Sequence, residues 1–261
     1  MNRAEIRRLE KNKGAYFGES VDVDALLTEQ RHYAGQHDWQ MDTLPARAGA
    51  ELLALRRQVA RPARRIYLSA GIHGDEPAGP LAVRELLREN AWPADADIFL
   101  CPCLNPTGGK LNRRESDQGI DLNRDYRQPR AAETRAHIGW LERQPPFDLC
   151  LCLHEDWEAH GFYVYEVNPD HRPSLAKAMV EAVRTVCPID PSELIDGREA
   201  KAGIIRPNLD PALRPEWPEA FYLIQHRTRL SYTLEAPSDF PLPVRVAALV
   251  TAVKTALNSQ V

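Results

Sequence analysis

The chain has 261 residues, of which 43% are hydrophobic and 27% charged, and its formal net charge is −4. This length and apolar content suit one large α/β domain with a substantial core. The acidic balance argues against nucleic-acid binding, which needs a basic face, and the apolar runs are too short to span a membrane. The first residues are basic but lack the apolar core of a signal peptide, so we expect a cytoplasmic protein.

Hydrophobic patterning predicts helices and strands that alternate along most of the chain. The first fifty residues form a polar lead-in with a helix-like stretch at 21–36, and residues 50–59 fit either a strand or a helix. Strands are then expected at 65–71, 97–104, 147–154, 161–167 and 228–235, and helices at 77–90, 130–143, 172–187 and 241–257. This alternation predicts a single α/β domain, with a mixed, mostly parallel twisted sheet covered by helices on both faces.

A proline-rich stretch between residues 188 and 218 interrupts this alternation. Long irregular segments in a domain of this kind are usually functional loops. We therefore interpret this stretch as a functional loop rather than a linker.

Five cysteines raise the question of a thiolate metal site. Four of them form the pairs Cys101/Cys103 and Cys150/Cys152, and Cys187 stands alone. An odd number of cysteines without a secretory signal argues against a disulfide framework. Each pair lies in an apolar strand-like run, where the C-x-C spacing puts both sulfur atoms on one face. We therefore predict buried cysteines that act as small hydrophobic residues.

Polar side chains follow several of the predicted strands at the points where those strands end. His73 and Glu76 follow one strand, while His154 and Glu235 end two others. In an open α/β sheet, ligands bind beyond the carboxyl ends of the strands. Two imidazoles and one carboxylate, with a fourth position left open, are typical of catalytic zinc. The pattern therefore predicts one Zn²⁺ ion held by His73, Glu76 and His154.

Other histidines and carboxylates offer alternatives to this ligand set. Glu155 and Asp156 follow His154 directly, and we interpret them as rim or supporting groups, with one of them replacing Glu76 as the less favoured alternative. Glu133 and His137 lie four residues apart in a predicted helix. Such spacing is typical of an exposed side-chain pair on a helix surface, so we do not expect them to bind a metal.

Four motifs together resemble a known family. They are "HGDE" at 73–76, "NPTGG" at 105–109, "RESDQGIDLNRDY" at 114–126 and "TLE" at 233–235, and they occur together with His154 at the end of a predicted strand. This combination resembles the zinc carboxypeptidases of the carboxypeptidase A/B superfamily, and is closer to their short bacterial members, including murein-tripeptide amidases, than to the pancreatic enzymes. The resemblance covers the chain between the first and last motif and leaves residues 1–50 unexplained.

The resemblance implies a metal centre with a nearby base. His73, Glu76 and His154 correspond to the zinc ligands, and Glu235 corresponds to the general base. Asp121 is expected to accept a hydrogen bond from the free ring nitrogen of His73, which orients the ring and raises its basicity.

The resemblance also implies how a substrate is held. Arg114 is expected to polarise the scissile carbonyl, and Asn123 and Arg124 to hold the terminal carboxylate of a small peptide or acylated amino acid. The larger carboxypeptidases carry a tyrosine about twenty residues before the catalytic glutamate, and this chain has none there. The possible substitutes are Tyr163, Tyr165 and Tyr222.

Three functions are compatible with these motifs. The favoured one is a zinc metallocarboxypeptidase that cleaves a C-terminal peptide or amide bond. The second is an N-acyl amino acid deacylase like aspartoacylase or succinylglutamate desuccinylase, although that branch spaces its arginine closer to the Asn-Arg pair than Arg114 lies from Asn123. The third is a non-catalytic zinc or carboxylate-binding module, against which Glu235 argues, because a binding site needs no base.

Overall fold

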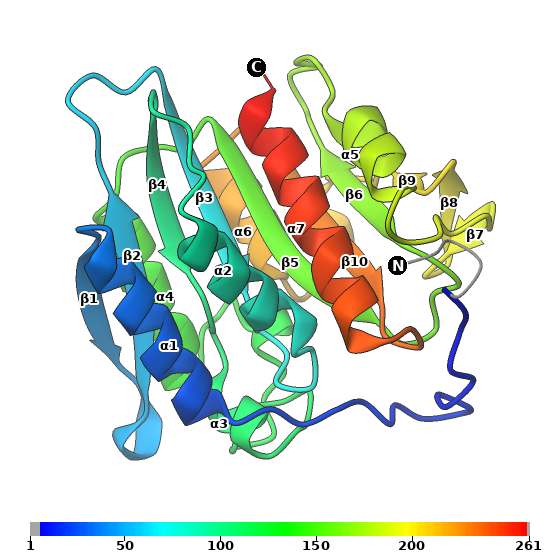
Figure 1. Ribbon diagram of the computed structural model, residues 1–261, viewed down its shortest axis with the longest axis horizontal. Helices are drawn as coiled ribbons and strands as arrows, with labels where there is room; N and C mark the ends of the chain where they lie inside the picture. Colours follow the sequence, from blue (N-terminus) through cyan, green and yellow to red (C-terminus); the bar gives the residue numbers. More distant parts are fainter. Residues whose placement is uncertain (1–5, 260–261) are drawn as a thin grey trace.

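The molecule is organised around a mixed sheet whose central strands are parallel (Figure 1). The computed structural model describes residues 6–259, and in this part the strand order is β1-β2-β4-β3-β5-β10-β6-β9-β8-β7. Strands β4, β3, β5 and β10 run parallel to one another. Strands β1 and β2 pair antiparallel with their neighbours, whereas β6 pairs antiparallel with β10 and parallel with β9. The strands are β1 (Gln40–Pro45), β2 (Glu51–Arg57), β3 (Arg64–Ala70), β4 (Ala96–Cys101), β5 (Leu149–Asp156), β6 (Tyr163–Val167), β7 (Leu194–Ile195), β8 (Arg198–Lys201), β9 (Ile204–Ile205) and β10 (Ser231–Pro237).

Helices cover both faces of this sheet, which confirms the predicted fold class. One face carries α1 (Val23–Gln36), α2 (Ala78–Glu89), α5 (Ala176–Val183) and α7 (Leu242–Asn258), and the other carries α4 (Ala132–Glu142) and α6 (Glu219–His226) (Figure 1). The short helix α3 (Pro106–Lys110) follows β4. Three 3-10 turns complete the regular structure: η2 (Arg47–Gly49), η3 (Leu122–Arg124) and η4 (Pro211–Leu213).

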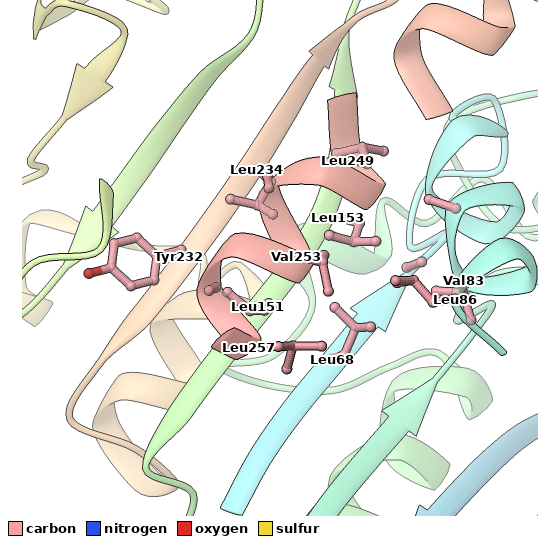
Figure 2. Packing of buried hydrophobic residues seen from close by; sticks show 14 of the residues in the cluster. Leu68, Val83, Leu86, Leu151, Leu153, Tyr232, Leu234, Leu249, Val253 and Leu257 are labelled. Atoms are coloured by element: carbon pink, nitrogen blue, oxygen red, sulfur yellow. The ribbon is translucent and has the colours of Figure 1, made fainter. Parts of the chain in front are cut away.

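The alternating side chains of β5 show how the sheet separates two cores. Leu149, Leu151 and Leu153 pack into the larger core under α2 and α7, whereas Cys150 and Cys152 point into the smaller core under α4. Figure 2 shows the larger core. This two-residue alternation is the normal pleat of a strand. All five cysteines are buried and free, which confirms the prediction that they serve as hydrophobic residues.

The N-terminal lead-in is part of the sheet rather than an appendage. Residues 50–59, left open between helix and strand, include β2, and β1 pairs with it at the sheet edge. Asp22 caps α1 by accepting a hydrogen bond from Ala25 N at 2.9 Å, and α1 packs against α2. Within residues 6–259, no helix has the length and apolar content needed to cross a membrane.

The proline-rich segment is more ordered than its sequence indicates. It contains the three short strands β7, β8 and β9, which extend the sheet beyond β6, and α6 begins directly after it. Strands of two to four residues carry too little pattern to be recognised in a sequence, and they form here because β9 pairs with β6.

Candidate metal centre and substrate cleft

The turn after β3 brings His73 to the carboxyl edge of the sheet. Its shape depends on close backbone contacts that only glycine permits. A Cβ on Gly74 would lie 2.1 Å from the carbonyl carbon of Gly108 and 2.3 Å from Gly109 N. Asn105 caps α3 by accepting a hydrogen bond from Gly108 N at 2.8 Å. The "HGDE" and "NPTGG" motifs therefore pack directly on each other, which explains why both are needed to form this edge.

The three predicted ligands converge there. His73 Nδ1 lies 2.5 Å from Glu76 Oε1, and His154 Nδ1 lies 3.0 Å from Glu76 Oε2. One donor atom from each residue lies within 4.8 Å of the other two, and all three side chains are buried. In the described part of the chain this is the only His/Cys/Asp/Glu cluster with such spacing. Its two imidazole nitrogens and one carboxylate fit the donor set of a catalytic zinc ion, so these residues could hold a metal.

The pKa shifts of Glu76 and His73 show that the charges of the three candidate ligands interact. Burial opposes ionisation of Glu76, but the neighbouring imidazoles of His73 and His154 hold its pKa well below the usual range. Burial likewise opposes protonation of His73, but the carboxylates of Glu76 and Asp121 raise the His73 pKa overall. The imidazoles of His73 and His154 thus offset the unfavourable burial of the Glu76 carboxylate charge.

Asp121 and Arg114 lie next to His73. Asp121 Oδ1 is 3.4 Å from His73 Nε2, a buried atom that has no hydrogen-bond partner in the described part of the chain. Arg114 Nε donates to Asp121 Oδ2 at 3.0 Å, and its Nη1 lies 3.9 Å from Glu76 Oε1. The Arg114 guanidinium is therefore held at the edge of the metal-ligand cluster. The predicted hydrogen bond between Asp121 and His73 stays a prediction at this separation.

Glu235 stands beside the cluster on β10. It pairs in register with His154 on β5 and with Tyr163 on β6. Its carboxyl group forms no hydrogen bond to another residue in the described part of the chain. Burial, together with the nearby carboxylates of Glu76 and Asp156 and despite the opposing effect of His154, raises the Glu235 pKa to about 8. An unpaired carboxyl group in this position can exchange a proton near neutral pH.

These residues line one cleft, with a volume of about 830 Å³. Its wall includes Asn123 and Arg124 from η3. The Asn123 side-chain oxygen accepts a hydrogen bond from Glu219 N at 2.9 Å, so Asn123 can offer its NH₂ group to a ligand. Arg124 is exposed and forms no ion pair within residues 6–259. Seven of the eight predicted site residues line the cleft, and Asp121 lies behind Arg114.

The structure separates the three candidate tyrosines and adds a fourth. Tyr163 and Tyr165 line the cleft, whereas Tyr222 packs in the core beside Tyr126. The cleft also includes Tyr16, whose buried hydroxyl has no hydrogen-bond partner in the described part of the chain. No sequence pattern marks Tyr16, because it reaches the cleft only through the path of the N-terminal segment.

Glu155 matches one of its two sequence interpretations, that of a supporting group, because its backbone N donates to Glu76 Oε2 at 3.1 Å. Glu155 is buried, not at the rim: its side chain accepts hydrogen bonds from Ala78 N at 2.6 Å and Arg245 Nη1 at 2.5 Å. Glu133 and His137 are also buried, which makes the expectation of an exposed pair wrong. His137 lies between the hydroxyls of Tyr67 and Tyr126 because α4 turns this face toward the sheet.

Comparison with known proteins supports the resemblance seen in the motifs. Residues 62–186 match the model of the "Succinylglutamate desuccinylase/Aspartoacylase catalytic domain" family, which lies within the zinc carboxypeptidase-like superfamily. This segment contains the three candidate metal ligands, and Glu235 lies beyond it. No curated protein matches the chain.

Solved structures share the fold along nearly the whole chain. A presumed metallopeptidase from Shewanella amazonensis SB2B is 22% identical, with a TM-score of 0.79 over 93% of this chain and 97% of that one. A metallo-carboxypeptidase from Pseudomonas aeruginosa, in complex with (2-guanidinoethylmercapto)succinic acid, is 18% identical, with a TM-score of 0.69 over 91% of this chain and 68% of the other. A metallo-carboxypeptidase from Burkholderia cenocepacia is 16% identical, with a TM-score of 0.66 over 90% and 69%. The fold is thus that of the zinc carboxypeptidase-like superfamily.

Proposed function

We propose that this protein is a zinc-dependent hydrolase that cleaves an amide bond in a small substrate with a free carboxylate. A metallocarboxypeptidase acting on C-terminal residues is the leading form of this proposal. The observation that supports it most directly is the meeting of His73, Glu76 and His154 at the cleft, with Glu235 adjacent in register to His154.

The donor set fits zinc, with His73, Glu76 and His154 as the residues that would hold it. A bound zinc ion would act as a Lewis acid and would lower the pKa of a water molecule bound to it to about 7. The buried position of the ligands favours such a role, because few water molecules compete for the ion there. Asp121 would orient His73 and Arg114 together, since it lies against both.

The other residues take roles that follow from their chemistry. Glu235 accepts a proton from the attacking water and delivers it to the departing amine, a step that typically contributes about 10²–10⁴-fold. Arg114 carries a permanent charge and can stabilise the oxyanion that develops on the carbonyl. Arg124 can grip a carboxylate through two parallel hydrogen bonds, while Asn123 supplies a neutral donor.

N-acyl amino acid deacylation is a second candidate with its own support. The matched family model describes succinylglutamate desuccinylases and aspartoacylases, and the match includes Arg114, Asn123 and Arg124. The spacing of Arg114 from Asn123 therefore does not decide against this branch. The two reactions differ in what lies on the acyl side of the bond.

A substrate comparison separates these reactions. Zinc-loaded protein would be assayed with short peptides and with N-acetyl and N-succinyl amino acids, and kcat/KM compared between the two groups. Glu235→Gln should lower activity by about 10³-fold while zinc content and folding stay unchanged. Full activity in that variant would remove Glu235 as the base, and zinc binding without turnover of any substrate would favour the non-catalytic binding module.

A further inference from the structure

A buried glutamate lies behind the cleft without a cation to balance it. Glu219 is the first residue of α6 and is only 1% exposed. Its carboxyl oxygens accept hydrogen bonds from Tyr67 Oη at 2.8 Å and Ser69 Oγ at 2.9 Å, both on β3. Within residues 6–259 it forms no ion pair with a lysine or arginine, and burial raises its pKa despite these hydrogen bonds. An apolar side chain would be buried here at lower cost, so the carboxyl group needs an explanation.

Tyr67 links Glu219 to a chain of hydrogen bonds through the smaller core. Burial lowers the pKa of His137 to about 3, so its ring is neutral and carries one N–H. Because the Tyr67 hydroxyl donates to Glu219, His137 Nε2 must donate to Tyr67 Oη, which lies 2.8 Å away. His137 Nδ1 then accepts from the Tyr126 hydroxyl at 2.6 Å. Each proton in this hydrogen-bond chain, which runs from Tyr126 to Glu219, therefore has one assigned place.

Both ends of the hydrogen-bond chain meet the segment that carries Asn123. Tyr126 follows Asn123 by three residues, and Glu219 N donates to Asn123 Oδ1 at 2.9 Å. Tyr126 N also donates to the carbonyl oxygen of Trp217 at 3.2 Å. The contacts form a closed ring whose members are Asn123, Tyr126, His137, Tyr67 and Glu219. Asn123 is thereby held with its amide oxygen toward α6, which leaves its NH₂ group for a ligand.

The same ring sets where α6 begins. Pro218, Ala220 and Phe221 lie next to Glu219 in the sequence and line the cleft. A shift of the first turn of α6 would therefore move this wall of the cleft together with Asn123. A fully satisfied buried polar network favours one arrangement, because a displacement leaves a buried donor or acceptor without its partner.

We propose that the hydrogen-bond chain from Tyr126 to Glu219 positions the Asn123 amide to donate to the terminal carboxylate of the substrate. None of the four residues in the hydrogen-bond chain lines the cleft, so they act through Asn123 and not on the substrate itself. This proposal rests on the proposed hydrolase function, because that function gives Asn123 its ligand. A side chain that is ordered before binding loses less conformational freedom when the ligand binds, so disturbing the hydrogen-bond chain should weaken carboxylate binding.

Carboxylate binding is measured on zinc-loaded Glu235→Gln protein, so that hydrolysis does not interfere. The probes are two matched pairs: Ala-Ala-Ala with its C-terminal amide, and N-acetylalanine with its C-terminal amide. Each pair differs only in the terminal carboxylate, and isothermal titration calorimetry gives the ratio of the affinities for acid and amide. Asn123→Ala should lower this ratio by about 10-fold, because a hydrogen bond to a charged group typically contributes that much.

A double-variant comparison tests whether Glu219 acts through Asn123. Glu219→Ala should also lower the acid-to-amide ratio by about 10-fold. The variant with both Asn123→Ala and Glu219→Ala should have the same ratio as Asn123→Ala alone, because no amide is left to position. Glu219→Gln, which keeps an acceptor for Tyr67, should retain part of the ratio. If Glu219→Ala does not fold, Tyr126→Phe takes its place in the comparison, since it breaks the other end of the hydrogen-bond chain.

Glu166→Gln is the matched control for loss of a buried carboxyl group. Glu166 on β6 is buried, accepts a hydrogen bond from Tyr232 Oη at 3.0 Å and does not line the cleft. This substitution should lower thermal stability and leave the acid-to-amide ratio unchanged. An equal loss of the ratio in this control would overturn the proposal, because the effect of Glu219 would then reflect general loosening of the fold.

The outcomes separate this proposal from the proposed function. Additive losses for Asn123→Ala and Glu219→Ala, or a ratio that either folded variant leaves unchanged, would overturn the positioning role even if the protein hydrolyses a substrate. Equal binding of acid and amide to the Glu235→Gln protein itself would also overturn it. Non-additive losses, in a protein whose Glu235-containing form hydrolyses neither peptides nor acylated amino acids, would support the positioning role and refute the hydrolase.

Discussion

The environment of Glu235 predicts an unusual dependence of stability on pH. Its pKa in the folded protein is raised from 4.5 to about 8, mainly by burial. The folded state therefore holds this proton more tightly than the unfolded state. Since stability falls with pH wherever the folded state binds more protons, Glu235 destabilises metal-free protein progressively between about pH 4.5 and pH 8.

The size of this effect follows from the same pKa values. Each tenfold change in a protonation equilibrium corresponds to about 1.4 kcal/mol, so a rise from 4.5 to about 8 disfavours the charged form by about 5 kcal/mol at most. Rotation of the side chain toward solvent would reduce this value. Glu235→Gln removes the ionisable group, so the variant should be more stable than the unsubstituted protein by several kcal/mol at pH 9 and by much less at pH 5.

Urea unfolding in the presence of a chelator measures this difference at each pH. Comparing the two proteins at one pH removes the contribution of the titrating groups that do not interact with Glu235. An equal stability difference at pH 5 and pH 9 would show that Glu235 is solvated, and would refute the argument from its buried position. In zinc-loaded protein the stability difference between the Glu235→Gln variant and the unsubstituted protein at pH 9 should be smaller. The reason is that a nearby cation favours the ionised Glu235 carboxylate.

Three more substitutions address the metal site and its support. His73→Ala should abolish zinc retention after dialysis, as read by metal analysis, while the exposed His32→Ala retains it; equal retention would exclude His73 as a ligand. Asp121→Asn should weaken zinc affinity by about 10- to 100-fold in a chelator competition, and an unchanged affinity would mean that the 3.4 Å gap to His73 is not closed in the loaded protein. Arg245→Ala should lower the free energy of unfolding by about 3–5 kcal/mol in urea, because it leaves the buried Glu155 carboxylate without its cation. A loss below 1 kcal/mol would show that this pair contributes little.

Part of the candidate site could be predicted from the sequence, and part could not. The sequence by itself determined the alternating elements and placed His73, Glu76, His154 and Glu235 at the ends of strands. This worked because an apolar strand must be buried, and the carboxyl ends of neighbouring parallel strands meet at one edge whatever the details of packing. The motif resemblance added expected roles for those residues, and these roles remain predictions.

Only the tertiary structure decided which further side chains reach the cleft. Tyr16 lies in a segment without periodic patterning, so its neighbours depend on how the chain crosses the sheet edge. The same limit explains the error at His137, since helix spacing shows which residues share a face but not whether another element covers that face. Burial is a property of contacts between distant segments, and for these residues the contacts form only when the whole sheet is assembled.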